Sequence, residues 1–209
     1  DISTLKHWVI ENFSTVPNHG RTKILTSESP FLPEQVSAKI NITPLAERRS
    51  LWIQFPVPSD LPNYEKHPLN LLSFLIGHEG KGSILSLLKN LGWAESLSAG
   101  NYGAADHGLL TISIGLTEEG LSEWTQVVDL CFQYMRLLQQ EPDLSRYYDE
   151  SRQISNLNFQ FKEPSKPVAL VRSTSYRMMY YPQEHVLNLS TMYDEYDHAL
   201  ISEYLTRLH

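Results

Sequence analysis

The sequence lacks several features that would assign it to a class of protein. Its 209 residues contain a single cysteine, Cys131, so the chain can form neither an internal disulfide nor a thiolate metal cluster. No apolar run reaches the roughly 18 residues that a membrane-spanning helix needs, because even the apolar stretch 69–76 stops at Gly77 and His78. We therefore expect no membrane span.

Positive charge is also scarce. The chain has 17 Lys and Arg against 24 Asp and Glu, a formal net charge of -7, which would repel a phosphate backbone and makes nucleic acid an unexpected partner. Hydrophobic residues at 41% and aromatic residues at 11% are typical of a folded globular protein and exclude a mainly disordered one. The chain starts at Asp1 without a targeting signal, which indicates a piece of a longer protein.

The order of hydrophobic patterns predicts an α+β fold. Alternation over residues 36–43 and over 51–56 predicts two strands, which we expect to pair with each other in antiparallel fashion. Two more strands, 94–99 and 109–116, are expected to be joined by a glycine-rich turn at 100–103. Because strands precede long helices, we expect a mostly antiparallel sheet packed on one face by helices. Helical spacing predicts those helices over 5–13, 68–76, 83–90, 117–141, 143–161, 164–179 and 195–208.

Two of these helices have an apolar stripe that predicts which face is buried. The stripe of the first is Leu121, Trp124, Val128, Cys131, Met135 and Leu138. We expect its middle part, from Trp124 to Met135, to face the strand at 110–116. The stripe of the second is Leu144, Tyr147, Ile154, Leu157 and Phe161.

The residues contain no complete catalytic motif. A Gly-x-Ser-x-Gly elbow is absent, and the glycines at 77–82 lack the lysine of a phosphate loop because Ser83 takes its place. A His-Glu-x-x-His site starting at His78 would need a second histidine where Gly82 stands. The inverted motif ending at His185 has a tyrosine at its first ligand position. The residues therefore predict no zinc site in this chain.

One group of aromatic residues could stack on a ligand, although aromatic residues at helical spacing more often belong to a core. Its members are Tyr147, Tyr148, Tyr176, Tyr180 and Tyr181.

A longer stretch of sequence is more specific than any of these motifs. It reads LIGHEGKGSILSLLK at 75–89, GWA at 92–94 and LSAG at 97–100. Further landmarks stand in the same order at 55–58 (FPVP), 116–121 (LTEEGL), 132–134 (FQY) and 180–182 (YYP). Together they resemble the insulinase-type zinc metallopeptidases, the group of pitrilysin and insulin-degrading enzyme, along essentially the whole chain.

This resemblance implies a parent zinc endopeptidase built from four related α+β domains, of which this chain is the second. Residues 1–20 would be the last helix of the first domain, 21–35 a linker, and 36–209 the second domain. The zinc ligands and catalytic glutamate of such enzymes lie in the first domain, so zinc is implied for the parent and no cofactor for this piece. The implied partners are a peptide or small unfolded protein, the missing first domain and the C-terminal half. Resemblance to pitrilysin implies the periplasm, with the cytoplasm as the alternative.

The resemblance also implies an exosite that holds the amino end of a substrate. Carried over by motif, the exosite falls on Gly77 and Glu79 in a turn and on Leu97, Ser98, Ala99 and Gly100 on a strand. The chain departs from the insulin-degrading branch at Asn70 and Phe74, where that branch has histidines, and at positions 98 and 99. We expect backbone pairing to tolerate these changes, because a strand edge binds through its amides and carbonyls. On the residues alone, a paired interior strand and a solvated carboxylate at Glu79 are the alternative.

These observations predict a non-catalytic domain that lines a degradation chamber and anchors peptides by strand addition. One alternative is a zinc-less structural or substrate-recognition subunit of the processing-peptidase type, and another is a free-standing peptide-binding module. A His-x-x-Glu-His motif upstream of Asp1 would favour the enzyme.

Overall fold

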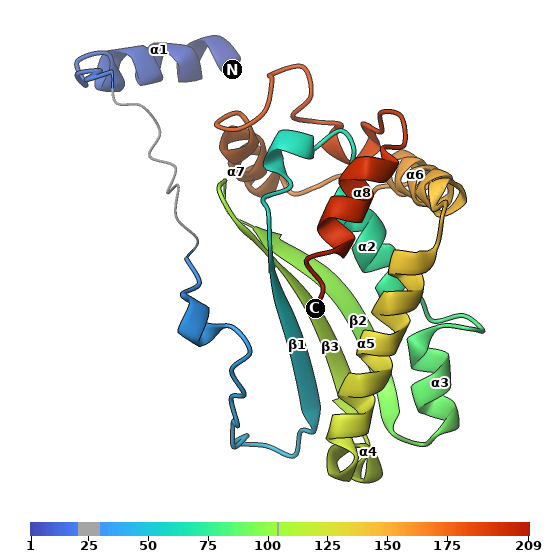
Figure 1. Ribbon diagram of the computed structural model, residues 1–209. Helices are drawn as coiled ribbons and strands as arrows, with labels where there is room; N and C mark the ends of the chain where they lie inside the picture. Colours follow the sequence, from blue (N-terminus) through green and yellow to red (C-terminus); the bar gives the residue numbers. More distant parts are fainter. Residues whose placement is uncertain (21–29, 104) are drawn as a thin grey trace.

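A three-stranded antiparallel sheet forms one layer of the fold (Figure 1). The structure is a computed structural model, and it describes residues 1–20, 30–103 and 105–209. The strands are β1 (Ser50–Val57), β2 (Ala94–Gly103) and β3 (Gly108–Leu116), and β3 lies between the other two. β1 therefore pairs with β3, with Ile53 opposite Ile112, and β2 pairs with β3, with Ala99 opposite the same residue. The predicted α+β class is confirmed.

Helices cover one face of this sheet (Figure 1). They are α2 (Pro68–Ile76), α3 (Ile84–Asn90), α5 (Trp124–Gln140) and α8 (His198–Leu205). Pro68 begins α2, where its fixed φ and missing N–H cost nothing. The Ser83 hydroxyl caps α3 by accepting a hydrogen bond from the Ser86 amide at 3.1 Å. The core between the two layers is made by buried apolar side chains that include Phe55, Leu72, Ile76, Leu88, Leu97, Leu110, Ile112 and Ile114.

The predicted helix after β3 is two helices, and this changes which side chains are buried. Thr117 caps α4 (Glu118–Ser122), the chain bends at Glu123, and α5 begins at Trp124. Trp124 therefore lies at a helix end and is only half-buried, with the Lys39 ammonium 4.0 Å from its ring centroid.

The buried face of α5 confirms part of the predicted stripe. Cys131, Met135 and Leu138 are buried as expected, whereas Val127 is fully buried in place of Val128, which is half-buried. The bend also leaves Leu121 exposed. Burial raises the pKa of the Cys131 thiol to about 12, so this cysteine belongs to the core rather than to a reactive site.

The predicted face of α6 (Ser145–Gln160) is wrong except for Leu144, which is buried just before the helix. The remaining members of the predicted stripe are exposed: Tyr147, Ile154, Leu157 and Phe161. Instead, α6 packs by side chains with hydroxyl groups. The Tyr148 hydroxyl donates to the Asp194 carbonyl at 3.1 Å, and the hydroxyls of Ser151 and Ser155 each lie 3.2 Å from the Tyr193 hydroxyl. Hydrogen bonding lets these polar groups be covered, which a hydrophobic count does not detect.

Two predictions about strands are also wrong. Residues 36–43 form no strand in the described structure, and Ile40 and Ile42 are 79% and 75% exposed. Alternation gives a segment one apolar face but supplies no partner for its backbone, and β1 pairs with β3 instead. The residues expected to turn at 100–103 continue β2, since Gly103 pairs with Gly108.

The N-terminal helix α1 (Ile2–Phe13) is confirmed and stands apart from the body of the fold (Figure 1). Asp1 caps it by accepting from the Ser3 amide at 3.2 Å, and none of its residues is buried. Nine residues of the linker expected at 21–35, residues 21–29, lie outside the described residues, and its end contains the short η1 (Pro33–Gln35).

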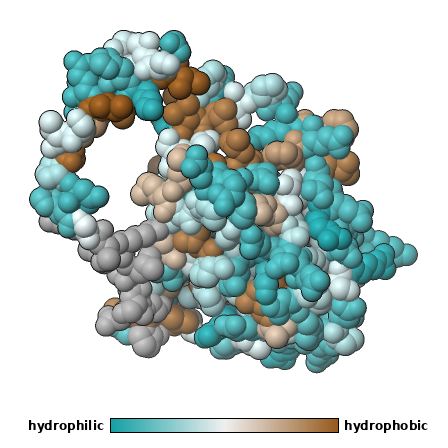
Figure 2. Space-filling view, turned by 90° about the horizontal axis from the view of Figure 1, so that it is seen from above, coloured by the Kyte–Doolittle hydropathy of each residue, from teal (hydrophilic) through white to brown (hydrophobic). Residues whose placement is uncertain are grey.

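The remaining described elements follow α6. They are α7 (Pro167–Arg177), two residues shorter than expected at its end, and η3 (Leu189–Thr191); η2 (Leu61–Asn63) precedes α2. Seen from the end where α1, α7 and α8 lie, the surface shows several hydrophobic patches among polar side chains (Figure 2). None of the helices described is long and apolar enough to cross a membrane.

Candidate functional site

Strand β2 forms an edge of the sheet. β3 pairs with one side of it, and within the described ranges no other strand pairs with its second side. The Leu97 side chain is 3% exposed and fixes the strand to the core, whereas Ser98 is exposed and Ala99 and Gly100 are half-buried. A Cβ added at Gly100 would have no atom within 4 Å. The buried Leu97 side chain thus anchors the strand to the core, while the small residues that follow it leave the backbone of the strand accessible.

The glycine turn after α2 lies directly against this strand. Gly77 ends α2, and its N–H donates to the Ser73 carbonyl at 2.9 Å. A Cβ at Gly77 would lie 2.8 Å from the Ser73 oxygen and 3.2 Å from the Ala99 nitrogen. Only glycine allows the helix end to approach Ala99 this closely. The structure therefore brings together the two segments that the family resemblance assigns to one site.

Glu79 stands exposed in the same turn. Its carboxylate has no hydrogen bond or ion pair with any part of the chain that the structure describes. Gly82, with a φ of +87°, and the capped start of α3 complete the turn. The carboxylate is therefore unpaired among the described residues, two residues after Gly77, whose backbone approaches Ala99.

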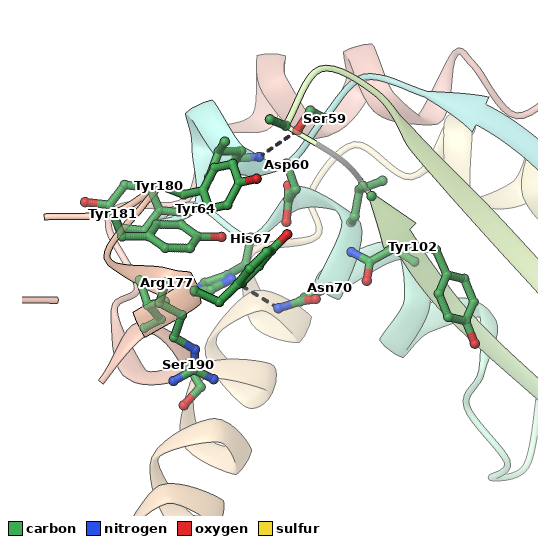
Figure 3. A pocket seen from close by; sticks show the side chains of 17 residues that line it. Ser59, Asp60, Tyr64, His67, Asn70, Tyr102, Arg177, Tyr180, Tyr181 and Ser190 are labelled. Atoms are coloured by element: carbon green, nitrogen blue, oxygen red, sulfur yellow. Dashed lines mark hydrogen bonds between the residues drawn. The ribbon is translucent and has the colours of Figure 1, made fainter. Parts of the chain in front are cut away.

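A cleft of about 380 Å³ opens at the other end of β2 (Figure 3). Asn101, Tyr102 and Gly103 line it from the strand. Its other walls come from η2 and the start of α2, from the end of α7, and from the segment around η3. The side chains that give it polarity are Asp60, Tyr64, His67, Asn70, Arg177 and Tyr181.

Asp60 is the most perturbed of these groups. Its Oδ1 atom is buried and has no hydrogen-bond partner among the described residues. Burial raises the pKa of this carboxyl from its usual 3.8 to about 6, opposed only in part by the nearby Leu69 backbone. Burial, and to a smaller extent the charge of Asp60, also raise the pKa values of Tyr181 and Tyr204. A carboxylate of this kind in a cleft is a candidate functional group.

His67 forms the floor of the cleft next to Pro68. Its φ of +45° places it in the left-handed region, which few residues other than glycine adopt. Its Nδ1 lies 3.1 Å from the Asn70 amide nitrogen, and its ring packs on Tyr193 with centroids 4.4 Å apart. Burial lowers the pKa of His67, which favours the neutral ring.

The opposite wall consists of tyrosines and one arginine. Tyr64 packs edge-on against Tyr181 with centroids 5.1 Å apart, and its hydroxyl lies 2.8 Å from His185 Nδ1. The Arg177 guanidinium donates to the Val186 carbonyl at 3.0 Å and lies toward Ser190, away from Asp60 (Figure 3).

The tyrosines singled out in the sequence divide between three places. Tyr148 belongs to the core, Tyr147 lies exposed on α6, and Tyr176, Tyr180 and Tyr181 line the cleft. Asp60 was not predicted from the sequence, because a single aspartate beside a proline-containing turn belongs to no motif. The only signal of the cleft in the sequence was the group of tyrosines.

The described residues do not fit a zinc site. No group of three or more His, Cys, Asp or Glu side chains is close enough to hold a metal ion within residues 1–20, 30–103 and 105–209. His78 is exposed in the glycine turn, and His185 is engaged by Tyr64.

Comparison with known proteins gives two family matches. Residues 1–150 match the description "Peptidase M16 inactive domain", and residues 159–209 match "Middle or third domain of peptidase_M16". Among curated proteins, the A-factor-processing enzyme of Saccharomyces cerevisiae is 34% identical over 100% of this chain and 20% of its own length. Human nardilysin is 33% identical over 99% of this chain and 19% of its own length. The insulin-degrading enzyme of Drosophila melanogaster is 34% identical over 99% of this chain and 21% of its own length. The chain thus spans about a fifth of the length of these relatives.

Solved structures share the fold. Pitrilysin superimposes with a TM-score of 0.84 at 22% identity, covering 100% of this chain and 22% of pitrilysin. A protease from Helicobacter pylori superimposes with a TM-score of 0.63 at 14% identity, covering 100% and 49%.

Proposed function

Because the chain belongs to the M16 family of insulinase-type peptidases and matches its inactive domain, we propose that it is the second domain of a zinc endopeptidase and anchors extended peptides on β2. In this proposal residues 36–209 form the domain and 1–20 end the preceding one. In the same proposal the metal and the catalytic glutamate belong to the parent's first domain.

The observation that carries the proposal is the open edge of β2. Two properties there suit strand addition: small residues from Ser98 to Gly100, and an edge that no described strand occupies. A peptide lying along the edge would exchange backbone hydrogen bonds with it, so binding would depend little on the peptide's side chains. Glu79 stands two residues after Gly77, which contacts Ala99, and in this proposal it would pair with the peptide's free ammonium group.

The second part of the proposal is that the sheet lines a chamber. The face turned away from the helices carries exposed polar side chains, and on it the Gln54 amide donates to the Thr111 hydroxyl at 3.2 Å. Trp52 and Tyr102 are also exposed there. A face that is polar with scattered aromatic groups suits a water-filled space that holds unfolded peptide.

Titration with one unstructured peptide in free and N-acetylated forms tests the anchoring role. We expect amide shifts at 97–100 in the 209-residue chain and weaker binding of the acetylated form. The affinity should be modest, because ordering a flexible peptide offsets much of the gain. Glu79→Gln should remove the difference between the two forms.

Glu95→Gln is the matched control, since it removes the same charge from an exposed position on β2 outside the proposed site. Equal affinity of the two forms for the unmodified chain, or shifts confined to other residues, would contradict the proposal.

A further inference from the structure

We propose that the cleft at the end of β2 binds a lysine or arginine side chain of the anchored peptide, with Asp60 as the group that pairs with the cation. This inference rests on the proposed function, because the peptide must lie on β2. A cation-binding cleft would give the site a preference for certain peptide sequences, whereas strand addition and Glu79 recognise only the backbone and the amino terminus of the peptide.

The first argument is the unpaired charge. Asp60 Oδ1 is buried without a hydrogen-bond partner in the described chain, and no described cation lies within ion-pair distance of the carboxylate. The Leu69 backbone hydrogen bond to the carboxylate offsets only part of the cost of its burial. A buried charge without a counter-ion is costly, and a bound cation would reduce that cost. The raised pKa of Asp60, about 6, has the same physical origin.

The second argument is the fit of the walls. A volume of about 380 Å³ accommodates one long side chain and its first waters. Tyr64 and Tyr181 line the cleft with aromatic rings, which attract cations through their faces and pack against methylene groups.

Arg177 in the same cleft carries the charge that would attract an anion instead. Its guanidinium already donates to the Val186 carbonyl at 3.0 Å and lies at the far end beside Ser190 (Figure 3). Two buried atoms of the cleft lack a hydrogen-bond partner among the described residues, Asp60 Oδ1 and His67 Nε2. The His67 ring is kept neutral by burial, so the carboxylate is the charged group of the two, and it attracts a cation.

The third argument is position. Asn101, Tyr102 and Gly103 line the cleft and follow Ala99 on the same strand. Strand residues advance about 3.3 Å each, so the mouth of the cleft begins about 7 Å from Ala99 and ends about 13 Å from it. A peptide whose first residue lies opposite Ala99, beside Glu79, and which runs parallel to β2 reaches the cleft with its third to fifth residues.

The experiment is a position scan with an uncharged peptide of Gly, Ala and Ser that carries one lysine at each of positions 1 to 7 in turn. The control peptides carry norleucine, which has nearly the same shape without the charge. We expect lysine to bind about tenfold more tightly than norleucine at one of positions 3 to 5, which is typical of a hydrogen bond to a charged group. Asp60→Asn should abolish that ratio, whereas Asp129→Asn on the exposed face of α5 should leave it unchanged.

The outcomes separate the two proposals. Amide shifts at 97–100 with a lysine-to-norleucine ratio of one at every position would overturn the cationic cleft and leave the anchoring role intact. A ratio that survives Asp60→Asn, or a preference at position 1 alone, would also overturn it. Absence of any shift at 97–100 would overturn the anchoring role itself.

Discussion

Replacing Asp60 with asparagine should stabilise the chain at neutral pH. The folded chain raises the pKa of this carboxyl from 3.8 to about 6, and each pKa unit corresponds to about 1.4 kcal/mol. The ionised carboxylate therefore reduces the free energy of unfolding by up to about 3 kcal/mol at pH 8. Asparagine has nearly the same shape and cannot ionise, so it removes this cost.

The sign of the pH dependence follows from linkage. The folded state binds the Asp60 proton more tightly than the unfolded state, so lowering the pH through 6 stabilises the native protein relative to pH 8. The stabilising effect of Asp60→Asn should be full above pH 6, decrease as the pH falls, and stop changing below about 3.8, where both states carry the neutral acid. Asp143 and Asp197 have lowered pKa values, through hydrogen bonds from Ser145 and Lys66 respectively. Their contributions to the pH dependence of stability cancel in the comparison, because the unmodified chain and the Asp60→Asn variant both contain them.

Urea unfolding followed by tryptophan fluorescence, at half-unit steps from pH 4 to pH 8, measures this difference. Asp129→Asn, the same change at an exposed position, is the control and should shift stability little at any pH. A constant offset between wild type and Asp60→Asn across the whole range would refute the reasoning, because it would show that the carboxyl titrates equally in the folded and unfolded states.

Three further outcomes follow from the fold. Gly120→Ala should destabilise the chain severely in a urea melt, because the new Cβ would lie 1.8 Å from the Trp93 carbonyl oxygen; an unchanged midpoint would contradict the packing of α4. Met135→Ala should lower the free energy of unfolding by about 2 to 5 kcal/mol, because Met135 is buried. Trp124→Ala should lower it by less than truncation of a buried aromatic residue does, because Trp124 is only half-buried. A larger loss for Trp124→Ala than for Met135→Ala would contradict the bend before α5. After dialysis against a weak chelator, metal analysis should find no stoichiometric zinc in this chain, and one zinc per chain would contradict the reading of its histidines.

The sequence predicted those parts of the fold that depend on local chemistry. Pro68 and the Ser83 hydroxyl mark helix starts by rules that act within a few residues, and both helices begin there. Strand pairing depends on partners far away in the chain. Apolar and polar residues alternate over 36–43 as regularly as they do in β3, yet residues 36–43 pair with no strand in the described structure.

The buried face of α6 shows a second limit. A hydrophobic stripe selected Ile154 and Leu157, but hydrogen bonds to the Asp194 carbonyl and the Tyr193 hydroxyl made the hydroxyl-bearing face the buried one. Those partners lie about forty residues further along the chain. No local pattern contains that information.

The candidate site also has a part that local sequence motifs indicate and a part that depends on distant segments of the chain. Motif similarity named Gly77 and the strand from Leu97 to Gly100, which stay a prediction as a binding site, and the structure places Gly77 against Ala99. The cleft could not be found in this way, because its walls come from four separate segments and its charged group belongs to no motif.

The cost carried by Asp60 argues for a role in binding rather than in folding. A carboxylate that pairs within the protein, such as Asp197 with the Lys66 ammonium at 2.7 Å, has a lowered pKa and supports the native state at neutral pH. Asp60 has the opposite shift, because the hydrogen bond from the Leu69 backbone offsets its burial only in part and Oδ1 has no described partner, so the folded chain is less stable for containing it. The same residue becomes favourable only when a cation enters the cleft. Stability and peptide binding should therefore respond to Asp60→Asn in opposite directions, a combination that a purely structural carboxylate would not produce.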